Sequence, residues 1–220
     1  MSELILTIGD KNLSSWSLRP WVLMKHAGIP FTEKNIKLDQ PQTRKILAEI
    51  SPAGQVPFLN HKIDAQETTV WDSLAIAEYL NDQFPEKNLW PTDSAARALA
   101  RSASAEMHSG FGNIRNLWPM QFVREGLNHL TTGGVQRDID RINEIWTQAR
   151  TEFGTKSQND EGFLFGAFSI ADAMYAPVVS RLMTYGPVAL SPLATAYRDQ
   201  MIKLPAMAAW GEGARAELDL

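Results

Sequence analysis

Apolar and polar positions separate the chain into a first part that mixes strands with helices and a second part that is helical. In the first part, alternation over residues 3–9 predicts a strand, and an amphipathic pattern over 72–84 predicts a helix. Between them, the pattern predicts strands at 31–38 and 56–59, one helix that ends at Gly28 and another that spans 42–50. The pattern at 65–70 is ambiguous. The expected order over residues 1–84 is β-α-β-α-β-β-α.

Pro20 limits where the first helix begins. Proline has no N–H donor, so a helix tolerates it where that donor would be unpaired, which is the first turn. The sequence therefore predicts that the helix is capped at about Trp16 or Ser17.

Turn-forming residues in the stretch PEKNLWPTDS predict a linker between the two parts. Beyond it, helical patterns are expected at 94–117, 135–153, 169–184, 191–202 and 205–215. The fold class expected from these patterns is α/β plus all-α, with a small α/β domain at 1–84 and an all-helical domain at 94–220. In the second domain Ser169 and Asp172 match an S-x-x-D capping box, whose role we expect to be structural. Replacing Asp172 is expected to cost about 0.5–2 kcal/mol.

Composition and charge exclude several classes of function. The chain has 220 residues, of which 44% are hydrophobic and 21% charged, and its formal net charge is −4. These values are typical of a soluble globular protein and give no support to nucleic-acid binding or to an anionic membrane surface. No apolar run is long enough to span a bilayer, and the first strand follows no basic segment. We therefore expect no signal peptide and a cytoplasmic location.

The chain contains no cysteine, which is the strongest single exclusion. Disulfides, thiolate metal sites and protein-thiol nucleophiles are all ruled out, so any thiol chemistry must use a thiol that a ligand brings. The histidines also lack the spacing of a metal site; they are His26, His61, His108 and His129. We expect no metal.

The segment Gln55-Val56-Pro57, followed by Asp72-Ser73 at the start of a helix, indicates a binding site for a peptide-like thiol. A cis bond before Pro57 would turn backbone N–H and C=O groups outward, ready to pair with an extended ligand. An acidic residue and a hydroxyl at a helix start could then hold the charged end of that ligand. The alternatives are a trans proline that begins an edge strand and ordinary helix caps.

Four segments together resemble the cytosolic glutathione transferase superfamily: SSWSLRPW, GQVPFL, WDSLAIAEYL and FSIADAMYAPVVSRL. The first is most similar to the SSCSWR box of the zeta class, which includes maleylacetoacetate isomerases. Ser14, Ser15, Ser17 and Arg19 match the serines and the arginine of that box, whereas Trp16 replaces its cysteine and Leu18 its tryptophan. These departures weaken the similarity to the isomerases and leave the superfamily resemblance intact.

The resemblance implies a thioredoxin-like N-terminal domain, an all-helical C-terminal domain, a homodimer, and glutathione as co-substrate. It also implies that Ser14 or Ser15 donates a hydrogen bond to the glutathione sulfur; the residues do not choose between them, and helix capping is the alternative role. The first tyrosine is Tyr79, so no tyrosine is available near this box. A thiol pKa of about 8.5 would have to fall by roughly two units, which requires about 2.7 kcal/mol.

The other boxes imply a path for the tripeptide. Val56 would offer its main chain to the cysteinyl part, and Gln55 would add a side-chain contact. Asp72 would bind the γ-glutamyl ammonium, and Ser73 the γ-glutamyl carboxylate. A pocket for the second substrate is expected at the end of the first long helix of the second domain; its candidate residues are His108, Phe111, Arg115 and Trp118.

The expected function is therefore conjugation of reduced glutathione to small hydrophobic electrophiles through a serine-stabilised thiolate. An alternative is a glutathione-dependent cis–trans isomerase of the maleylacetoacetate type. A second alternative is a non-catalytic scaffold that binds a protein partner. Retention of Ser14, Gln55 and Asp72 counts against the scaffold.

Overall fold

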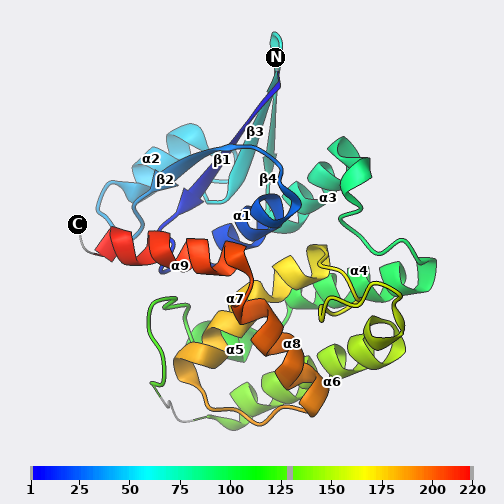
Figure 1. Cartoon of the computed structure of the whole chain (residues 1–220). Coiled ribbons are helices and arrows are strands. Elements are labelled where there is room, and N and C mark those ends of the chain that lie inside the picture. The colour runs from blue at the N-terminus through cyan, green and yellow to red at the C-terminus, as the bar shows by residue number, and fades with distance from the viewer. Residues whose placement is uncertain (1, 128–130, 219–220) are drawn as a thin grey trace.

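The computed structural model describes residues 2–127 and 131–218, so His129 lies outside the described residues. The first part of the chain folds as a sheet with helices on its faces (Figure 1). In order, its elements are β1 (Ser2–Gly9), α1 (Ser15–Ala27), β2 (Thr32–Ile36), α2 (Thr43–Ile50), β3 (Phe58–Ile63), β4 (Gln66–Trp71) and α3 (Ser73–Gln83). The predicted order is confirmed, and the ambiguous stretch forms β4.

The sheet has the strand order β2-β1-β3-β4. β1 pairs with β2 in parallel and with β3 in antiparallel orientation, and β4 is antiparallel to β3. Leu6 and Leu59 are partners across β1 and β3, and both are fully buried. This mixed four-stranded sheet, with helices packed against it, confirms the thioredoxin-like expectation.

The predicted start of the first helix was wrong by about a turn. α1 begins at Ser15 and is capped by Ser14, so Pro20 lies inside the helix. The proline removes one hydrogen bond, the one that its own nitrogen would have made to the carbonyl of Trp16. Helix interiors can lose one such bond when tertiary packing supports them, and α1 is buried along most of its length.

The second part of the chain is helical. Its helices are α4 (Ser94–Ser109), α5 (Gly112–Leu117), α6 (Gly133–Glu152), α7 (Ile170–Tyr185), α8 (Pro192–Ile202) and α9 (Pro205–Leu218). Short 3₁₀ turns at Pro85–Lys87 and Gly154–Lys156 complete the described elements. Among the described helices, none is long and apolar enough to cross a membrane.

The single helix expected over 94–117 is instead two helices, α4 and α5. The break lies at Gly110, whose backbone is extended, and Phe111, which has a φ of 59°. Arg115 stabilises the break because its guanidinium donates to the carbonyl oxygens of Gly110 and Met107. Hydropathy alone does not reveal this break, because it depends on a side chain that folds back onto the preceding helix.

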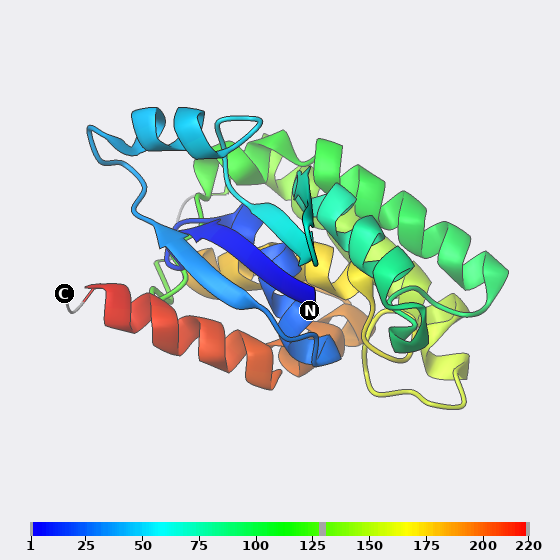
Figure 2. The same ribbon diagram turned by 90° about the horizontal axis from the view of Figure 1, so that it is seen from above.

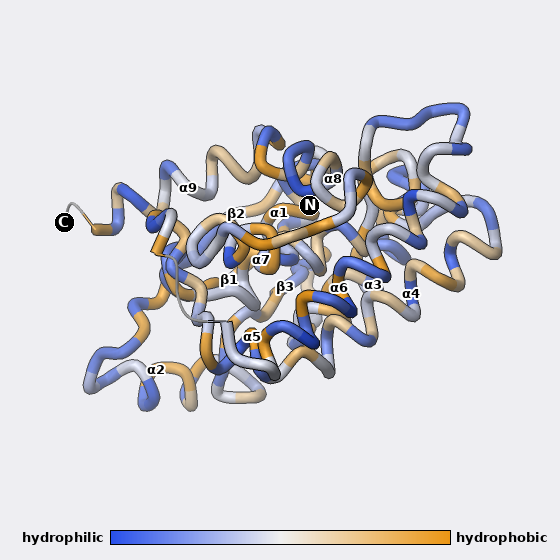
Figure 3. The backbone as a smooth tube through the Cα atoms, turned by 90° about the horizontal axis from the view of Figure 1, so that it is seen from below, coloured by the Kyte–Doolittle hydropathy of each residue, from blue (hydrophilic) through white to orange (hydrophobic). Residues whose placement is uncertain are grey.

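Helix α7 occupies the centre of the molecule. Only one of its residues, Met183, is not buried. α1 packs against it from the sheet side and α4 from the helical side, and hydrophobic positions gather around it (Figure 3). The C-terminal helix α9 runs back along the sheet beside β2 (Figure 2). The two parts of the chain therefore share one continuous core.

The predicted capping box at the start of α7 is confirmed. The Asp172 carboxylate accepts hydrogen bonds from the Ser169 N–H at 2.8 Å and from the Ser169 hydroxyl at 2.9 Å. It also accepts the N–H of Leu164 at 3.0 Å, and Asp172 itself has no exposed surface. The box thus fixes both the start of α7 and the segment that precedes it.

Candidate active site

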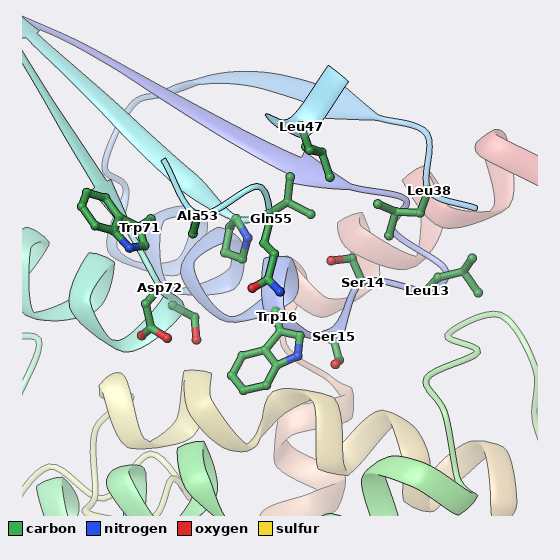
Figure 4. Close-up of a pocket in the computed structure, with 13 residues that line it drawn as sticks. Leu13, Ser14, Ser15, Trp16, Leu38, Leu47, Ala53, Gln55, Trp71 and Asp72 are labelled. Atoms are coloured by element: carbon green, nitrogen blue, oxygen red, sulfur yellow. The ribbon is translucent and has the colours of Figure 1, made fainter. Parts of the chain in front are cut away.

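A cavity of about 530 Å³ opens where α1, β4 and α3 meet (Figure 4). The residues that line it are Leu13, Ser14, Ser15, Trp16, Leu38, Leu47, Ala53, Gln55, Val56, Pro57, Trp71, Asp72 and Ser73. Every residue expected to activate or bind glutathione is among them. Figure 4 shows Asp72 on one side, the two serines on the other, and Gln55 between them.

Ser14 stands at the N-terminus of α1 and belongs to a short hydrogen-bonded chain. Its hydroxyl donates to the Ser17 hydroxyl at 2.7 Å, and its Oγ accepts the Ser17 N–H at 3.4 Å. The Ser17 hydroxyl in turn accepts the N–H of Gly9 at 3.1 Å. Ser17 is fully buried, so this chain fixes the Ser14 oxygen from behind. The hydroxyl also lies where the positive end of the helix dipole favours an anion.

Ser15 occupies the next position but points elsewhere. Its hydroxyl has no hydrogen-bond partner within the described ranges, and the residue is 7% exposed. In Figure 4 the Ser14 oxygen points toward the side of the cavity where Gln55 lies, whereas the Ser15 oxygen points toward the helices of the second domain. The two serines therefore face different parts of the cavity.

The Val56–Pro57 bond is cis, as the sequence analysis expected. The backbone before it is held by Ser51, whose hydroxyl donates to the Gln55 carbonyl at 2.7 Å and accepts the Gln55 N–H at 3.1 Å. With its backbone fixed in this way, Gln55 extends its side chain into the cavity (Figure 4).

Asp72 and Ser73 lie at the N-terminus of α3. Asp72 has a φ of 73° and a ψ of 133°, outside the left-handed helical region in which acidic and amide residues are enriched, so its backbone is strained. One carboxylate oxygen of Asp72 caps the helix by accepting the N–H groups of Leu74 at 2.8 Å and Ala75 at 3.3 Å. The Ser73 hydroxyl accepts an N–H of Arg19 at 3.3 Å, which leaves the Ser73 proton free to be donated.

Arg19 is a buried cation behind the cavity, and the sequence analysis gave it no role beyond its match to the family box. It is 1% exposed, and its Nε and one terminal nitrogen have no partner in the described part of the chain. Burial, followed by repulsion from Arg115 and Arg181, lowers the pKa of Arg19 to about 9. Arg19 therefore remains mainly protonated at pH 7, and its positive charge favours an anion nearby.

Trp16 separates this arginine from the second domain. The Arg19 guanidinium lies 4.2 Å from the Trp16 ring centroid and that of Arg115 lies 4.8 Å from it. Both distances are within the range of cation–π attraction. Burial lowers the pKa of Arg115, with Asp138 opposing the shift. The indole that replaces the cysteine of the zeta box is thus fixed by cations from both domains.

His108 is the expected second-substrate residue that comes nearest to the glutathione-binding candidates. Its Nε2 lies 3.1 Å from Oδ2 of Asp72, and its ring packs edge-on against Trp16 at 5.3 Å. The Arg115 guanidinium also packs against the Trp16 ring, while its nitrogens donate to the carbonyl oxygens of Gly110 and His108 at the end of α4. Neither residue lines the cavity itself.

Phe111 and Trp118, the other two candidates for the second-substrate pocket, are both buried in the core. Phe111 is 7% exposed and Trp118 is 1% exposed. Trp118 stacks on Tyr185 with ring centroids 5.4 Å apart. The two residues flank α5, with Phe111 as its N-cap and Trp118 as its C-cap.

Sequence reasoning also missed apolar residues that line the cavity. They are Leu13, Leu38, Leu47, Ala53 and Trp71. Trp71 is 48% exposed at the end of an edge strand. Because the hydrophobic pattern of β4 is weak, the exposed indole was the only feature that could have indicated a role in the cavity. Within the described ranges, no group of three His, Asp or Glu side chains could hold a metal ion.

Comparisons with known proteins identify relatives of both parts of the chain. The family described as "Glutathione S-transferase, N-terminal domain" matches residues 13–83, and "Glutathione S-transferase, C-terminal domain" matches residues 132–211. A probable maleylacetoacetate isomerase of Caenorhabditis elegans is 33% identical over 111 residues, which cover 50% of this chain and 49% of the relative. Glutathione S-transferase 1 of Dianthus caryophyllus is 32% identical over 118 residues, covering 53% and 51%.

The chain thus spans about half the length of these two curated relatives. Among solved structures, a glutathione transferase homologue from a Burkholderia strain, with bound glutathione, superposes with a TM-score of 0.69. The superposition covers 97% of this chain and 99% of that one at 22% identity, so it supports the fold.

Proposed function

Because this chain belongs to the glutathione S-transferase family, we propose that it binds reduced glutathione and transfers it to small hydrophobic electrophiles. The observation that carries the proposal is the cavity itself. It gathers two serines at a helix N-terminus, the segment Gln55–Pro57, and the Asp72-Ser73 pair into one space. These residues are remote in sequence, and each supplies a group that a tripeptide thiol requires.

The glutathione backbone would lie across the cavity from Asp72 to Ser14. The Asp72 carboxylate is an acceptor for the γ-glutamyl ammonium. Ser73 would donate its proton and its N–H to the neighbouring carboxylate, because Arg19 already occupies a lone pair of its hydroxyl. The main chain of Val56 would pair with the cysteinyl residue, and Gln55 would close the site from above.

Ser14 is our choice for the hydroxyl that meets the sulfur, because its oxygen points toward the Gln55 side of the cavity (Figure 4). In the structure the Ser14 hydroxyl donates to Ser17. When a thiolate is bound, this bond would reverse, so that the Ser17 hydroxyl donates to Ser14 and Ser14 donates to sulfur. The Gly9 N–H donates to Ser17 throughout, so each bond polarises the next. The dipole of α1 adds to the same stabilisation, whereas the Arg19 charge lies beside Ser73, where it would favour the γ-glutamyl carboxylate.

The size of the effect follows from the thiol pKa. At a pKa of about 8.5, roughly 3% of the thiol is ionised at pH 7, whereas at 6.5 roughly three quarters is ionised. The thiolate population at pH 7 would therefore rise about 25-fold, which is the upper limit of the gain in rate, because a thiolate of lower pKa is also a weaker nucleophile. Attack by this thiolate on a bound electrophile forms the sulfur–carbon bond and releases the leaving group or completes the addition.

The test compares Ser14→Ala with the matched variant Ser15→Ala. We expect Ser14→Ala to lower kcat at pH 7 by up to about 25-fold and to move the apparent pKa of the pH–rate profile toward 8.5, with little change in glutathione affinity by calorimetry. Ser15→Ala should retain most of the rate. If both single variants and the double variant keep the wild-type rate, serine activation is wrong; if the wild-type chain does not bind immobilised glutathione, the non-catalytic scaffold is the better interpretation.

A second candidate is a glutathione-dependent cis–trans isomerase of a small unsaturated acid. The 33% identity to a probable maleylacetoacetate isomerase favours it, as do the serines and the arginine of the first box. The thiolate would add to a conjugated double bond, permit rotation and leave unchanged. Product mass separates the two candidates, because conjugation adds the tripeptide and isomerisation adds nothing.

Further features extend the proposal. We place the domain boundaries at 1–84 and 94–220, and we expect a cytoplasmic homodimer, as is typical of this family. The electrophile would enter beside Trp16, on the side of the cavity that faces the second domain (Figure 4). His108 and Arg115, which contact Trp16, would influence that entrance. Phe111 and Trp118 would act only through the packing behind it.

A further inference from the structure

The loop between β1 and α1, residues 10–14, leads directly to Ser14 and is held from the far end of the chain. Lys11 donates its N–H to Oε2 of Glu217 at 2.7 Å, and its carbonyl accepts the indole N–H of Trp210 at 2.8 Å. Both partners belong to α9, roughly two hundred residues away in the sequence. Both peptide groups of one loop residue are thereby fixed by a single helix.

The Lys11 side chain strengthens the same attachment. Its ammonium pairs with Glu33 and lies 5.8 Å from the ring centroids of both Trp21 and Trp210. Trp210 is fully buried and packs edge-on against Trp21 at 5.2 Å. Glu217 is fixed in turn by Asn35 of β2 at 2.6 Å. The attachment therefore joins the loop, the sheet edge and α9 in one network.

A second segment of the helical domain holds the next loop residue. The carbonyl of Asn12 accepts the N–H of Phe122 at 3.1 Å, and its side-chain oxygen accepts the N–H of Val123 at 3.1 Å. Ser14 then has little freedom, because its own N–H donates to the Asp10 carbonyl at 2.8 Å. The position of the Ser14 hydroxyl depends on these attachments as well as on α1.

We infer that Trp210 and Glu217 are positioning residues that clamp the loop of residues 10–14 and so set the position of the Ser14 hydroxyl relative to a bound thiol. The inference deepens the proposed function and rests on it for the chemistry. The clamp does not touch the ligand, since Gln55, Val56 and Asp72 would hold the tripeptide. Its loss should therefore reduce turnover and spare glutathione binding, because a displacement of about 1 Å can cost up to about 100-fold in rate.

The experiment uses Glu217→Ala and Trp210→Phe, with Glu212→Ala as the matched control. Glu212 is exposed on the same helix and makes no hydrogen bond within the described residues. Hydrogen exchange of a peptide covering residues 10–15 reports the clamp without any ligand. We expect faster exchange in both clamp variants and wild-type exchange in the control. We also expect kcat to fall several-fold, by no more than the roughly 25-fold loss that bounds Ser14→Ala, with the glutathione KM nearly unchanged.

Three outcomes would overturn the inference: unchanged exchange in the clamp variants, faster exchange with unaltered kcat, or equal effects in Glu212→Ala. If the wild-type chain proves unable to bind glutathione, the proposed function fails, and the exchange data alone then decide whether α9 clamps the loop. Calorimetry of the wild type with glutathione separates that failure from failure of the clamp.

Discussion

Replacing Asp172 with alanine tests how much of the stability depends on one buried carboxylate. The side chain has no exposed surface and accepts three hydrogen bonds, from the N–H of Leu164, the N–H of Ser169 and the Ser169 hydroxyl. Alanine would leave three donors without a partner in a space that water does not reach. The perturbation is therefore larger than the loss of a helix cap.

The magnitude follows from the number of orphaned donors. Each buried donor left unsatisfied costs about 1–3 kcal/mol, and breaking a buried charged network costs about 3–5 kcal/mol in total. A surface cap costs about 0.5–2 kcal/mol. We expect Asp172→Ala to lower the free energy of unfolding by about 3–5 kcal/mol, above the range expected from the capping box alone, because the structure adds the Leu164 bond.

The assay is urea denaturation followed by far-UV circular dichroism at low temperature. With an m-value of about 2–3 kcal/mol/M, the midpoint should fall by about 1–2.5 M. Asp93→Ala is the matched control, because Asp93 caps α4 through a single bond to the Ala96 N–H and is exposed. Asp172→Asn should lose less than alanine, since one oxygen remains to accept.

One result would refute this reasoning. If Asp172→Ala costs no more than Asp93→Ala, the buried bonds to Leu164 and Ser169 add nothing to the cap. Because Asp172 has no proposed role in chemistry, the folded fraction of the variant should retain the glutathione affinity of the wild type. A loss of affinity at full folding would contradict the structural role.

Two further predictions concern the cavity and its surroundings. Asp72→Asn retains a side chain of the same shape that can cap the helix but removes the charge, so we expect the Kd for glutathione to rise about 10-fold with little change in the unfolding midpoint; an unchanged Kd in calorimetry would show that Asp72 does not bind the ammonium. Trp118→Ala should lower the free energy of unfolding by about 3–5 kcal/mol and leave the glutathione KM of the folded enzyme unchanged, whereas a specific rise in the KM for the electrophile would return Trp118 to the pocket.

Local signals predicted the elements that carry strong periodicity or a motif. The strand β1, the amphipathic α3 and the Ser169–Asp172 box were all found where expected, although β1 is buried continuously from Leu4 to Gly9. In these segments the hydrophobic pattern and the local chemistry agree, so tertiary packing had nothing to override. The cavity positions of the segment Gln55–Pro57 and of the pair Asp72-Ser73 were predicted from motifs, because the roles of these residues depend on backbone chemistry that a short sequence encodes.

The remaining features depend on contacts between distant residues. Pro20 lies within α1 because packing on both sides supports the helix against the lost bond. Phe111 adopts a positive φ because Arg115 folds back on α4. The contact between His108 and Asp72 joins helices of two domains, and no pattern in either segment predicts it. The hold of α9 on Lys11 is equally invisible, since it links the two ends of the chain.

The burial of α1 has a consequence for any attempt to divide the protein. Buried residues follow one another from Leu18 to Met24 without the polar face that a surface helix carries, because the sheet covers one side and α7 the other. Cutting the chain within PEKNLWPTDS would leave the thioredoxin-like half with a bare apolar stripe, prone to aggregate. Separate family models match the two halves of the chain. Because the halves share one core, however, we expect them to unfold together.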